Sequence, residues 1–289
     1  MQVTEPMIQD DSAAEGKYAD ASDGRVFYQE WGEGPAIILI HGGGPGAYGY
    51  SNFRKNIGPL SRRNRVIVID LPGYGRSAKR LQPDGLTVSL ASAVRDVMDH
   101  VGIERASLVG NSLGGMTSLR FALDMPERVE KLVLMGPGGS LPMFTPFPTE
   151  GLQRMLDFYE GDGPTIEKLS RVIDLLVYDR SAITQELLEE RFRVCTLPET
   201  MQNPPLRKLQ AHPKDALWTQ GIDKIACPTL LVWGAQDRVI PMDAAFLLQR
   251  LIANADLHVF SKCGHWVQWE RPDEFNALVE QFVNLSKGL

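Results

Sequence analysis

The chain has few cysteines, no long hydrophobic run and no excess of positive charge, and each absence excludes a class of protein. Its three cysteines among 289 residues are widely spaced and form neither an even-numbered disulfide framework nor a CxxC metal pair (Cys195, Cys227, Cys263). The longest apolar stretches, such as Ala36 to Ile40, are far too short to span a bilayer. The first residues are acidic and polar, unlike a secretion signal. We therefore expect a cytoplasmic protein with reduced thiols and no membrane partner.

The charge balance is mildly acidic. Lysine and arginine total 30 and aspartate and glutamate total 36, which gives a net charge of −6. Such a surface gives no reason to expect nucleic acid as a partner. No metal-binding spacing such as H-E-x-x-H appears, so we expect neither a metal nor another cofactor.

Short β-branched runs alternate with helical patterns, which is typical of parallel strands joined by crossover helices. The sequence predicts six such strands, preceded by an antiparallel strand over Val26–Trp31: Ala36–Ile40, Arg65–Asp70, Ala106–Val109, Lys131–Met135, Thr229–Trp233 and Leu257–Phe260. From 141 to 212 the chain is helical and rich in proline, without a convincing buried strand. We therefore predict a doubly wound, mostly parallel α/β sheet from segments 1–140 and 213–289, with 141–212 inserted as a helical lid over its ligand-binding edge.

The motif G-x-S-x-G at Gly110–Gly114 predicts a nucleophilic serine. It follows the strand Ala106–Val109 and opens a helical run, which is the strand–turn–helix setting of a nucleophile elbow in the α/β-hydrolase fold. A serine in a glycine-rich turn can also be a simple helix N-cap. The flanking elements favour Ser112 as the nucleophile.

In this fold the acid and the base follow the serine in that order. His265 comes just after the last predicted strand, whereas His212 precedes a proline in the lid and His258 lies inside a strand pattern. Asp237 follows the strand Thr229–Trp233 by a short loop. Asp243 is better explained as a charge in the first turn of the next helix. The sequence thus predicts His265 as general base and Asp237 as the acid that orients it.

The loop after the first parallel strand reads His41-Gly42-Gly43-Gly44, where a second oxyanion donor is expected. We predict that the Gly43 and Leu113 amides form the oxyanion hole. The same loop also spells G-x-G-x-x-G from Gly44, and Asp70 ends the following strand, as in a dinucleotide site. That motif begins four residues after its strand and leaves the three triad candidates unexplained, which argues against a dehydrogenase.

With these motifs the chain resembles the meta-cleavage-product hydrolases, which split carbon–carbon bonds in the degradation of aromatic and steroid rings. The resemblance covers nearly the whole chain and rests on HGGGPGA from His41, GNSLGG from Gly110, MGPGG from Met135 and CGHW from Cys263. It is strongest to the branch acting on 2-hydroxy-6-oxo-6-phenylhexa-2,4-dienoate, an intermediate of biphenyl degradation. It implies hydrolysis to 2-hydroxypenta-2,4-dienoate and a carboxylic acid such as benzoate, by a homo-oligomer.

The resemblance also implies which residues bind this small-molecule substrate: Gly42, Asn52, Asn111, Arg191 and Trp266. The helical pattern supports Arg191 independently, because this arginine falls on the apolar stripe of the run from Ile183 to Cys195. A buried arginine needs a partner, either the substrate carboxylate or an internal carboxylate. The remaining alternative is an arginine whose charged end reaches the surface. On sequence alone Asn111 and Trp266 fit equally well as packing residues, whereas Asn52 is expected at the 2-hydroxy end.

Two other functions stay open on the sequence. The same triad would serve a carboxylesterase, and a receptor on this fold would bind without turnover. The lid offers several bulky apolar side chains as lining for the acyl substituent: Met143, Phe144, Phe147, Met155, Phe158 and Leu176.

Overall fold

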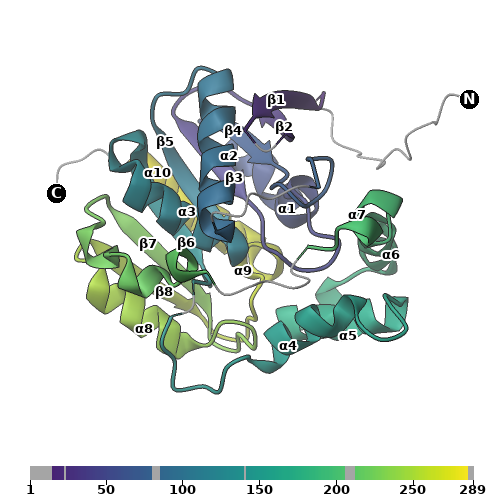
Figure 1. Cartoon of the computed structure of the whole chain (residues 1–289). Helices are drawn as coiled ribbons and strands as arrows, with labels where there is room; N and C mark the ends of the chain where they lie inside the picture. The colour runs from purple at the N-terminus through teal and green to yellow at the C-terminus, as the bar shows by residue number, and fades with distance from the viewer. Residues whose placement is uncertain (1–14, 23, 80–84, 140, 206–211, 286–289) are drawn as a thin grey trace, which may run out of the picture.

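An eight-stranded sheet forms the centre of the protein (Figure 1). The computed structural model describes residues 15–22, 24–79, 85–139, 141–205 and 212–285. The strands lie in the order β1-β2-β4-β3-β5-β6-β7-β8, and β2 pairs antiparallel with both β1 and β4, whereas all other neighbours are parallel. Their bounds are β1 Lys17–Ala21, β2 Gly24–Trp31, β3 Ala36–Ile40, β4 Arg65–Ile69, β5 Ala106–Asn111, β6 Val129–Met135, β7 Thr229–Gly234 and β8 Ala255–Phe260.

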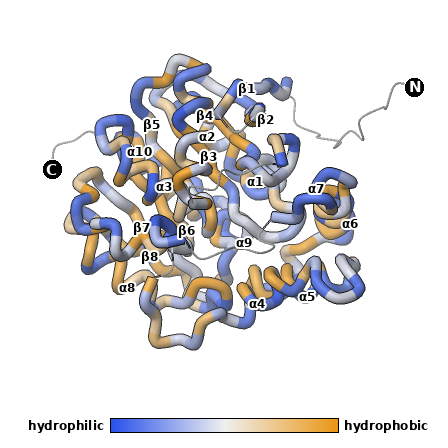
Figure 2. Tube along the Cα trace, viewed as in Figure 1, coloured by the Kyte–Doolittle hydropathy of each residue, from blue (hydrophilic) through white to orange (hydrophobic). Residues whose placement is uncertain are grey.

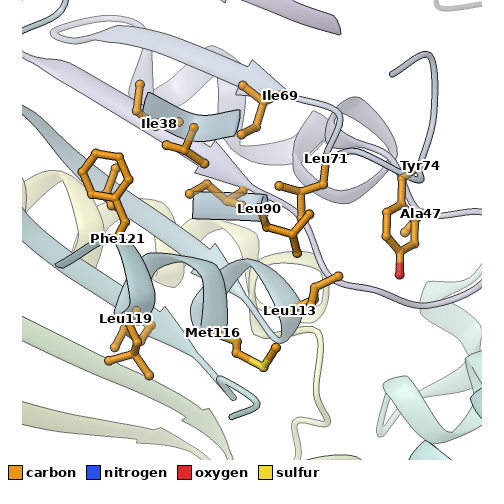
Figure 3. Close-up of a cluster of buried hydrophobic side chains, with 14 of the residues drawn as sticks. Ile38, Ala47, Ile69, Leu71, Tyr74, Leu90, Leu113, Met116, Leu119 and Phe121 are labelled. Carbon is orange, nitrogen blue, oxygen red and sulfur yellow. The ribbon is translucent and has the colours of Figure 1, made fainter. Parts of the chain in front are cut away.

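Helices cover both faces of this sheet, which explains why central parallel strands such as β3 and β4 are almost entirely apolar. Ile38 and Ile40 of β3 face a cluster shared with α2 (Leu86–His100), α3 (Leu113–Asp124) and α8 (Met242–Leu251). Ile37 and Leu39 point the other way, to α1 (Gly49–Leu60) and α10 (Pro272–Asn284). Figure 3 shows part of the first cluster, in which Leu90 and Phe121 from α2 and α3 pack near Ile38 and Ile69.

A helical segment follows β6 and precedes β7. It contains α4 (Glu150–Leu156), α5 (Ile166–Leu176), α6 (Gln185–Cys195) and α7 (Pro198–Gln202), which lie together and apart from the helices that flank the sheet (Figure 1). Hydrophobic and hydrophilic stretches alternate along α4 and α5 (Figure 2). This segment contacts the loops at the carboxyl ends of the strands, since the Trp266 amide donates to the Leu176 carbonyl at 3.0 Å and the Gly151 amide to the Arg238 carbonyl at 3.3 Å.

The remaining elements are short. They are α9 (Val267–Glu270) and 3-10 turns at Pro126–Arg128, Asp157–Tyr159, Arg180–Ala182, Pro213–Asp215, Leu217–Thr219 and Ile222–Lys224. None of the helices within the described ranges is long and apolar enough to cross a bilayer.

The predicted fold is confirmed, with the seven predicted strands found to within two residues at each end. One strand was missed: β1, at the sheet edge, reads KYADA and is largely exposed. The stretch from 141 to 205 contains no strand, in line with the prediction of an inserted helical segment. Residue 140 and residues 206–211, at the predicted boundaries of that segment, lie outside the described residues.

Candidate active site

Ser112 lies on a strained turn between β5 and α3. Its φ of 52° falls in the left-handed region, which a serine adopts at a cost of roughly 1–3 kcal/mol. The turn is secured on both sides, because the Ser112 amide donates to the Met135 carbonyl at 2.8 Å and the Ser112 carbonyl accepts from the Gly138 amide at 3.2 Å. These two hydrogen bonds hold Ser112 at the carboxyl end of β5.

The glycines of the elbow are required by close contacts. A Cβ on Gly110 would lie 2.4 Å from the Gly114 carbonyl oxygen, and a Cβ on Gly114 would lie 2.0 Å from the Ile40 carbonyl oxygen. Neither backbone oxygen could move aside without disturbing α3 or the neighbouring strand β3. These contacts explain the G-x-S-x-G spacing in steric terms.

Asp237 and His265 form a buried pair. The His265 Nδ1 and the Asp237 Oδ2 are 2.7 Å apart, and both side chains are about 1% exposed. The other carboxylate oxygen of Asp237 accepts from the amides of Val239 and Ile240 at 2.8 and 2.9 Å. The carboxylate is therefore fixed in place and leaves His265 Nε2, which has no hydrogen-bond partner among the described residues, free to act.

Two glycines bring the loops of this pair together. A Cβ on Gly234 at the end of β7 would lie 2.0 Å from the Gly264 carbonyl oxygen, and a Cβ on Gly264 would lie 2.8 Å from the backbone of Leu176. The Gln236 amide donates to the Cys263 carbonyl at 3.0 Å, and the Gln236 side chain accepts from the Cys263 amide at the same distance. The loop after β7 is thus pinned to the loop after β8, which explains how Asp237 meets His265.

The glycine loop after β3 lies against the start of α3. A Cβ on Gly43 would lie 3.1 Å from Leu113 Cδ2, and a Cβ on Gly42 would lie 3.4 Å from Ser112 Cβ. Leu113 is the first residue of α3, so its amide is one of those that a helix leaves without an internal partner. The structure therefore brings the two predicted oxyanion donors beside Ser112.

A small pocket of about 10 Å³ beside Ser112 is lined by polar groups, among them Asn52, Asn111, Arg191 and His265, and by Trp266. Several buried polar atoms of these residues find no hydrogen-bond partner within the described part of the chain: Asn52 Nδ2, Asn111 Oδ1, Arg191 Nη1 and His265 Nε2. Unpartnered buried polar atoms are rare in native proteins, because each costs free energy. All four residues line this one pocket, which favours a site for a polar ligand.

Arg191 supplies the positive charge of this pocket. The side chain is 1% exposed, lies 4.7 Å above the Trp266 ring, and donates through Nε and Nη2 to the Pro45 carbonyl at 3.3 and 3.2 Å. Burial lowers the pKa of Arg191 to about 10, so the guanidinium stays protonated at neutral pH. No carboxylate of the described residues forms an ion pair with it, which argues against the internal salt bridge that the sequence left open.

A larger cavity of about 660 Å³ also borders Ser112. Its wall is mostly apolar and includes Met116, Leu141, Met143, Phe147, Met155 and Ile240. The two cavities share Gly43, Ser112 and Met155. A ligand that spans both would place its polar end at Arg191 and its apolar end in the larger cavity.

The predicted lining of this cavity is partly wrong. Phe144 is 99% exposed and points away from the site, because its backbone follows a loop anchored on Asp243 at the start of α8. Phe158 is buried but lies in the core of the helical segment, packed edge-on against Tyr159. Leu176 lines the small polar pocket instead.

Comparisons with known proteins agree with this geometry. Residues 35–272 match the model of the alpha/beta hydrolase fold family. The chain is 42% identical to a 2-hydroxy-6-oxo-6-phenylhexa-2,4-dienoate hydrolase of Comamonas testosteroni, over 91% of this chain and 93% of that protein. This chain is an α/β hydrolase of the meta-cleavage product hydrolase family. It is also 39% identical to a 2-hydroxy-6-oxononadienedioate/2-hydroxy-6-oxononatrienedioate hydrolase of Burkholderia vietnamiensis, over 97% and 99% of the two chains.

Solved structures of related proteins superpose on this hydrolase over most of its length. A meta-cleavage product hydrolase from Pseudomonas fluorescens IP01 matches with a TM-score of 0.79 and 35% identity, over 93% of this chain and 97% of that one. The 2-hydroxy-6-oxo-6-phenylhexa-2,4-dienoate hydrolase from Rhodococcus sp. strain RHA1 matches with a TM-score of 0.79 and 28% identity, over 94% and 100%.

A buried charge network around Glu190 was not predicted. Glu190 precedes Arg191 on α6 but points to α1, where it accepts from the Tyr48 hydroxyl and from Arg54 Nη2 at 2.6 Å. Only 7% of Glu190 is exposed. Its ion pair is with Arg54, so the network ties α6 of the hydrolase to α1. Glu190 also favours the charged form of Arg191 electrostatically, although the two form no ion pair. In the sequence, Glu190 is recognisable only as a glutamate at the boundary of the apolar stripe of α6. Such glutamates are too common in helices to predict a buried ion pair.

Asp70 and the glycine loop have a structural role in this hydrolase, in place of the dinucleotide contact considered above. The Asp70 carboxylate accepts from the Gly49 amide at 2.8 Å and from the Arg76 amide at 2.9 Å. Gly46 has a φ of 67°, and a Cβ there would lie 2.1 Å from the Arg191 carbonyl oxygen. The second glycine of the apparent motif is therefore explained by the close approach of α6.

Proposed function

We propose that this protein is a serine-dependent hydrolase that cleaves the C–C bond of 2-hydroxy-6-oxohexa-2,4-dienoates. The observation that carries the proposal is the pair of cavities that meet at Ser112, one polar and cationic, the other large and apolar. A dienoate of this kind has a carboxylate and a hydroxyl at one end and a ketone with its substituent at the other. The names of the relatives from Comamonas and Burkholderia support this substrate class.

In this proposal the polar pocket binds the 2-hydroxy acid end. The planar guanidinium of Arg191 suits a carboxylate, and its unpartnered Nη1 would donate to it. Asn52 Nδ2 would donate to the 2-oxygen, while Asn111 and Trp266 complete the pocket wall together with Gly42. With one cation, Arg191, and the neutral amides of Asn52 and Asn111, the pocket suits a ligand end that carries a single negative charge.

The reaction must avoid the departure of an unstabilised carbanion. Ketonisation of the dienol first moves a proton to C5, with His265 in the proton transfer, so that the later leaving group is a delocalised dienolate. Ser112 Oγ then adds to the C6 ketone as His265 takes its proton, and the Gly43 and Leu113 amides stabilise the oxyanion. Breaking of the C5–C6 bond leaves an acyl group on Ser112 and expels the dienolate. His265 returns the proton taken from Ser112 to the dienolate oxygen, which gives 2-hydroxypenta-2,4-dienoate and leaves His265 neutral for the next step.

Water then attacks the acyl group with His265 as base, which yields the carboxylic acid and restores the serine. Asp237 stabilises the His265 imidazolium in both halves without taking the proton itself. The residues of this hydrolase account for every proton in the sequence, and one water is consumed for each bond cleaved.

For the C6 substituent we propose an uncharged, bulky group such as phenyl. The described residues that line the larger cavity include no lysine or arginine, whereas Asp215 contributes a carboxylate that accepts from the Leu86 and Thr87 amides. A substrate with a second carboxylate at this end would meet the Asp215 carboxylate and no lysine or arginine. The one histidine of this lining, His212, uses its Nδ1 to accept from the Lys214 amide at 3.2 Å. Residues 141–205 would act as the lid of this cavity, since Met143, Phe147 and Met155 line it.

The decisive experiment compares three substrates. We expect purified protein to bleach 2-hydroxy-6-oxo-6-phenylhexa-2,4-dienoate with a higher kcat/KM than an analogue ending in a second carboxylate, and with a much higher kcat/KM than a simple phenyl ester. Faster hydrolysis of the ester would identify a carboxylesterase with the same triad. Binding of the dienoate without any turnover would identify a receptor. A biphenyl-type pathway, a homo-oligomer and a cytoplasmic location also belong to the proposal, and rest on the family resemblance and composition.

A further inference from the structure

We propose that His41 and Tyr74 are positioning residues that aim the Gly43 amide at the oxyanion. The inference rests on the proposed function, because it explains how one of the proposed oxyanion donors is set in place. Both side chains are buried, hydrogen-bond to carbonyls of the glycine loop, and are not among the residues that line the two cavities. Neither one contacts the reacting atoms in the mechanism above.

The tautomer of His41 follows from its two hydrogen bonds. The Leu71 amide can only donate, and it contacts His41 Nε2 at 2.9 Å, so Nε2 carries the lone pair. The proton therefore lies on Nδ1, which donates to the Gly42 carbonyl at 2.7 Å. Burial lowers the pKa of His41 to about 4, which keeps the ring neutral and both bonds intact at neutral pH.

The hydrogen bond from His41 to the Gly42 carbonyl also fixes the orientation of the Gly43 N–H. The Gly42 carbonyl and the Gly43 N–H belong to one planar group, and the only cis peptide bond within the described ranges is Phe147-Pro148. In a trans peptide the C=O and N–H point in opposite directions. A carbonyl held by His41 thus directs the Gly43 N–H away from the His41 ring. Gly43 itself lies beside the start of α3, since a Cβ on it would be 3.1 Å from Leu113 Cδ2.

Tyr74 secures the next peptide group in the same way. Its hydroxyl donates to the Gly43 carbonyl at 3.0 Å, and its ring packs edge-on against His41 with centroids 5.3 Å apart. In Figure 3 the Tyr74 ring lies in the apolar cluster near Ala47 and Leu71. Three successive glycines would otherwise sample many backbone conformations, so these two bonds supply the preorganisation that an oxyanion donor needs.

A matched pair of variants tests the proposal. Asparagine places its side-chain NH2 near the position of His41 Nδ1, whereas the amide of glutamine reaches the position of Nε2. H41N therefore retains the bond to Gly42, and H41Q retains the bond to Leu71. Each loses one of two buried hydrogen bonds, so we expect similar losses in Tm, which a thermal melt would check.

The kinetic expectations differ. We expect H41Q to lose about 100-fold in kcat with KM within about threefold of wild type, because a misdirected oxyanion donor costs about as much as a missing one. H41N should stay within about tenfold of wild type. Y74F, which leaves the core packing in place, should lose about tenfold in kcat at unchanged KM.

Equal kcat losses in H41N and H41Q, or a full-rate Y74F, would overturn the proposal. If neither His41 variant folds, the Y74F result decides alone. Measuring kcat also on a phenyl ester separates this test from the proposed function. An enzyme that hydrolyses only the ester would refute C–C cleavage, yet the contrast between H41N and H41Q would still have to appear on that ester.

Discussion

Replacing Arg191 with leucine tests whether its guanidinium binds the substrate carboxylate. Leucine keeps the apolar contacts of α6 but removes the cation and the donor atom Nη1, which has no hydrogen-bond partner in the described chain. A hydrogen bond to a charged group contributes about 1.5–3 kcal/mol. At about 1.4 kcal/mol for each factor of ten, kcat/KM for the phenyl dienoate should fall about 10- to 150-fold.

The assay follows the loss of dienolate absorbance for R191L and, as a control, R193L, since Arg193 lies on the exposed face of the same helix. A neutral phenyl ester, which has no carboxylate to bind, is measured in parallel. We expect R193L to match wild type on both substrates and R191L to match it on the ester. If R191L lost as much activity on the ester as on the dienoate, the role of Arg191 would be to pack the lid against Pro45.

Three further predictions concern buried groups. D237N should lower kcat by about 10⁴-fold with little change in Tm, since the altered hydrogen bond favours the wrong His265 tautomer; near-normal turnover would contradict the role of this carboxylate. E190A should raise KM for the dienoate and lower Tm, because it leaves the partly buried guanidinium of Arg54 without its partner and removes a link between α6 and α1. An unchanged KM would show that α6 needs no such anchor. In the folded protein the pKa of His41 is about 4, against 6.5 for an ordinary histidine. As the pH falls, His41 therefore becomes protonated in the unfolded chain before it does so in the folded protein. The free energy of unfolding should fall by about 3 kcal/mol between pH 6.5 and pH 4. Urea unfolding at several pH values would detect this as a steeper loss in wild type than in H41N, and equal slopes would disprove it.

The sequence predicts the strands and the chain order of Ser112, Asp237 and His265 because these depend on local signals. Parallel strands that are buried on both faces read as continuous apolar runs, and the residues after their carboxyl ends gather at one edge. The edge strand β1 was missed because Lys17, Ala19 and Asp20 have little β propensity and one side of the strand faces solvent.

In the helical segment between β6 and β7, the sequence predicts some positions of side chains but not others. The apolar stripe of α6 predicts that Arg191 is buried, since a helical period is a local property. The burial of Glu190 and the exposure of Phe144 depend on how α6 and the loop after β6 pack against segments distant in sequence. No local pattern could predict that Tyr48 and Arg54 would meet Glu190.

Product analysis of wild type and S112A tests the central claim most directly. The account predicts that wild-type protein converts 2-hydroxy-6-oxo-6-phenylhexa-2,4-dienoate into equal amounts of benzoate and 2-hydroxypenta-2,4-dienoate, while S112A forms neither. Bleaching of the substrate without benzoate, or equal benzoate release by S112A, would contradict cleavage of the C–C bond by this serine.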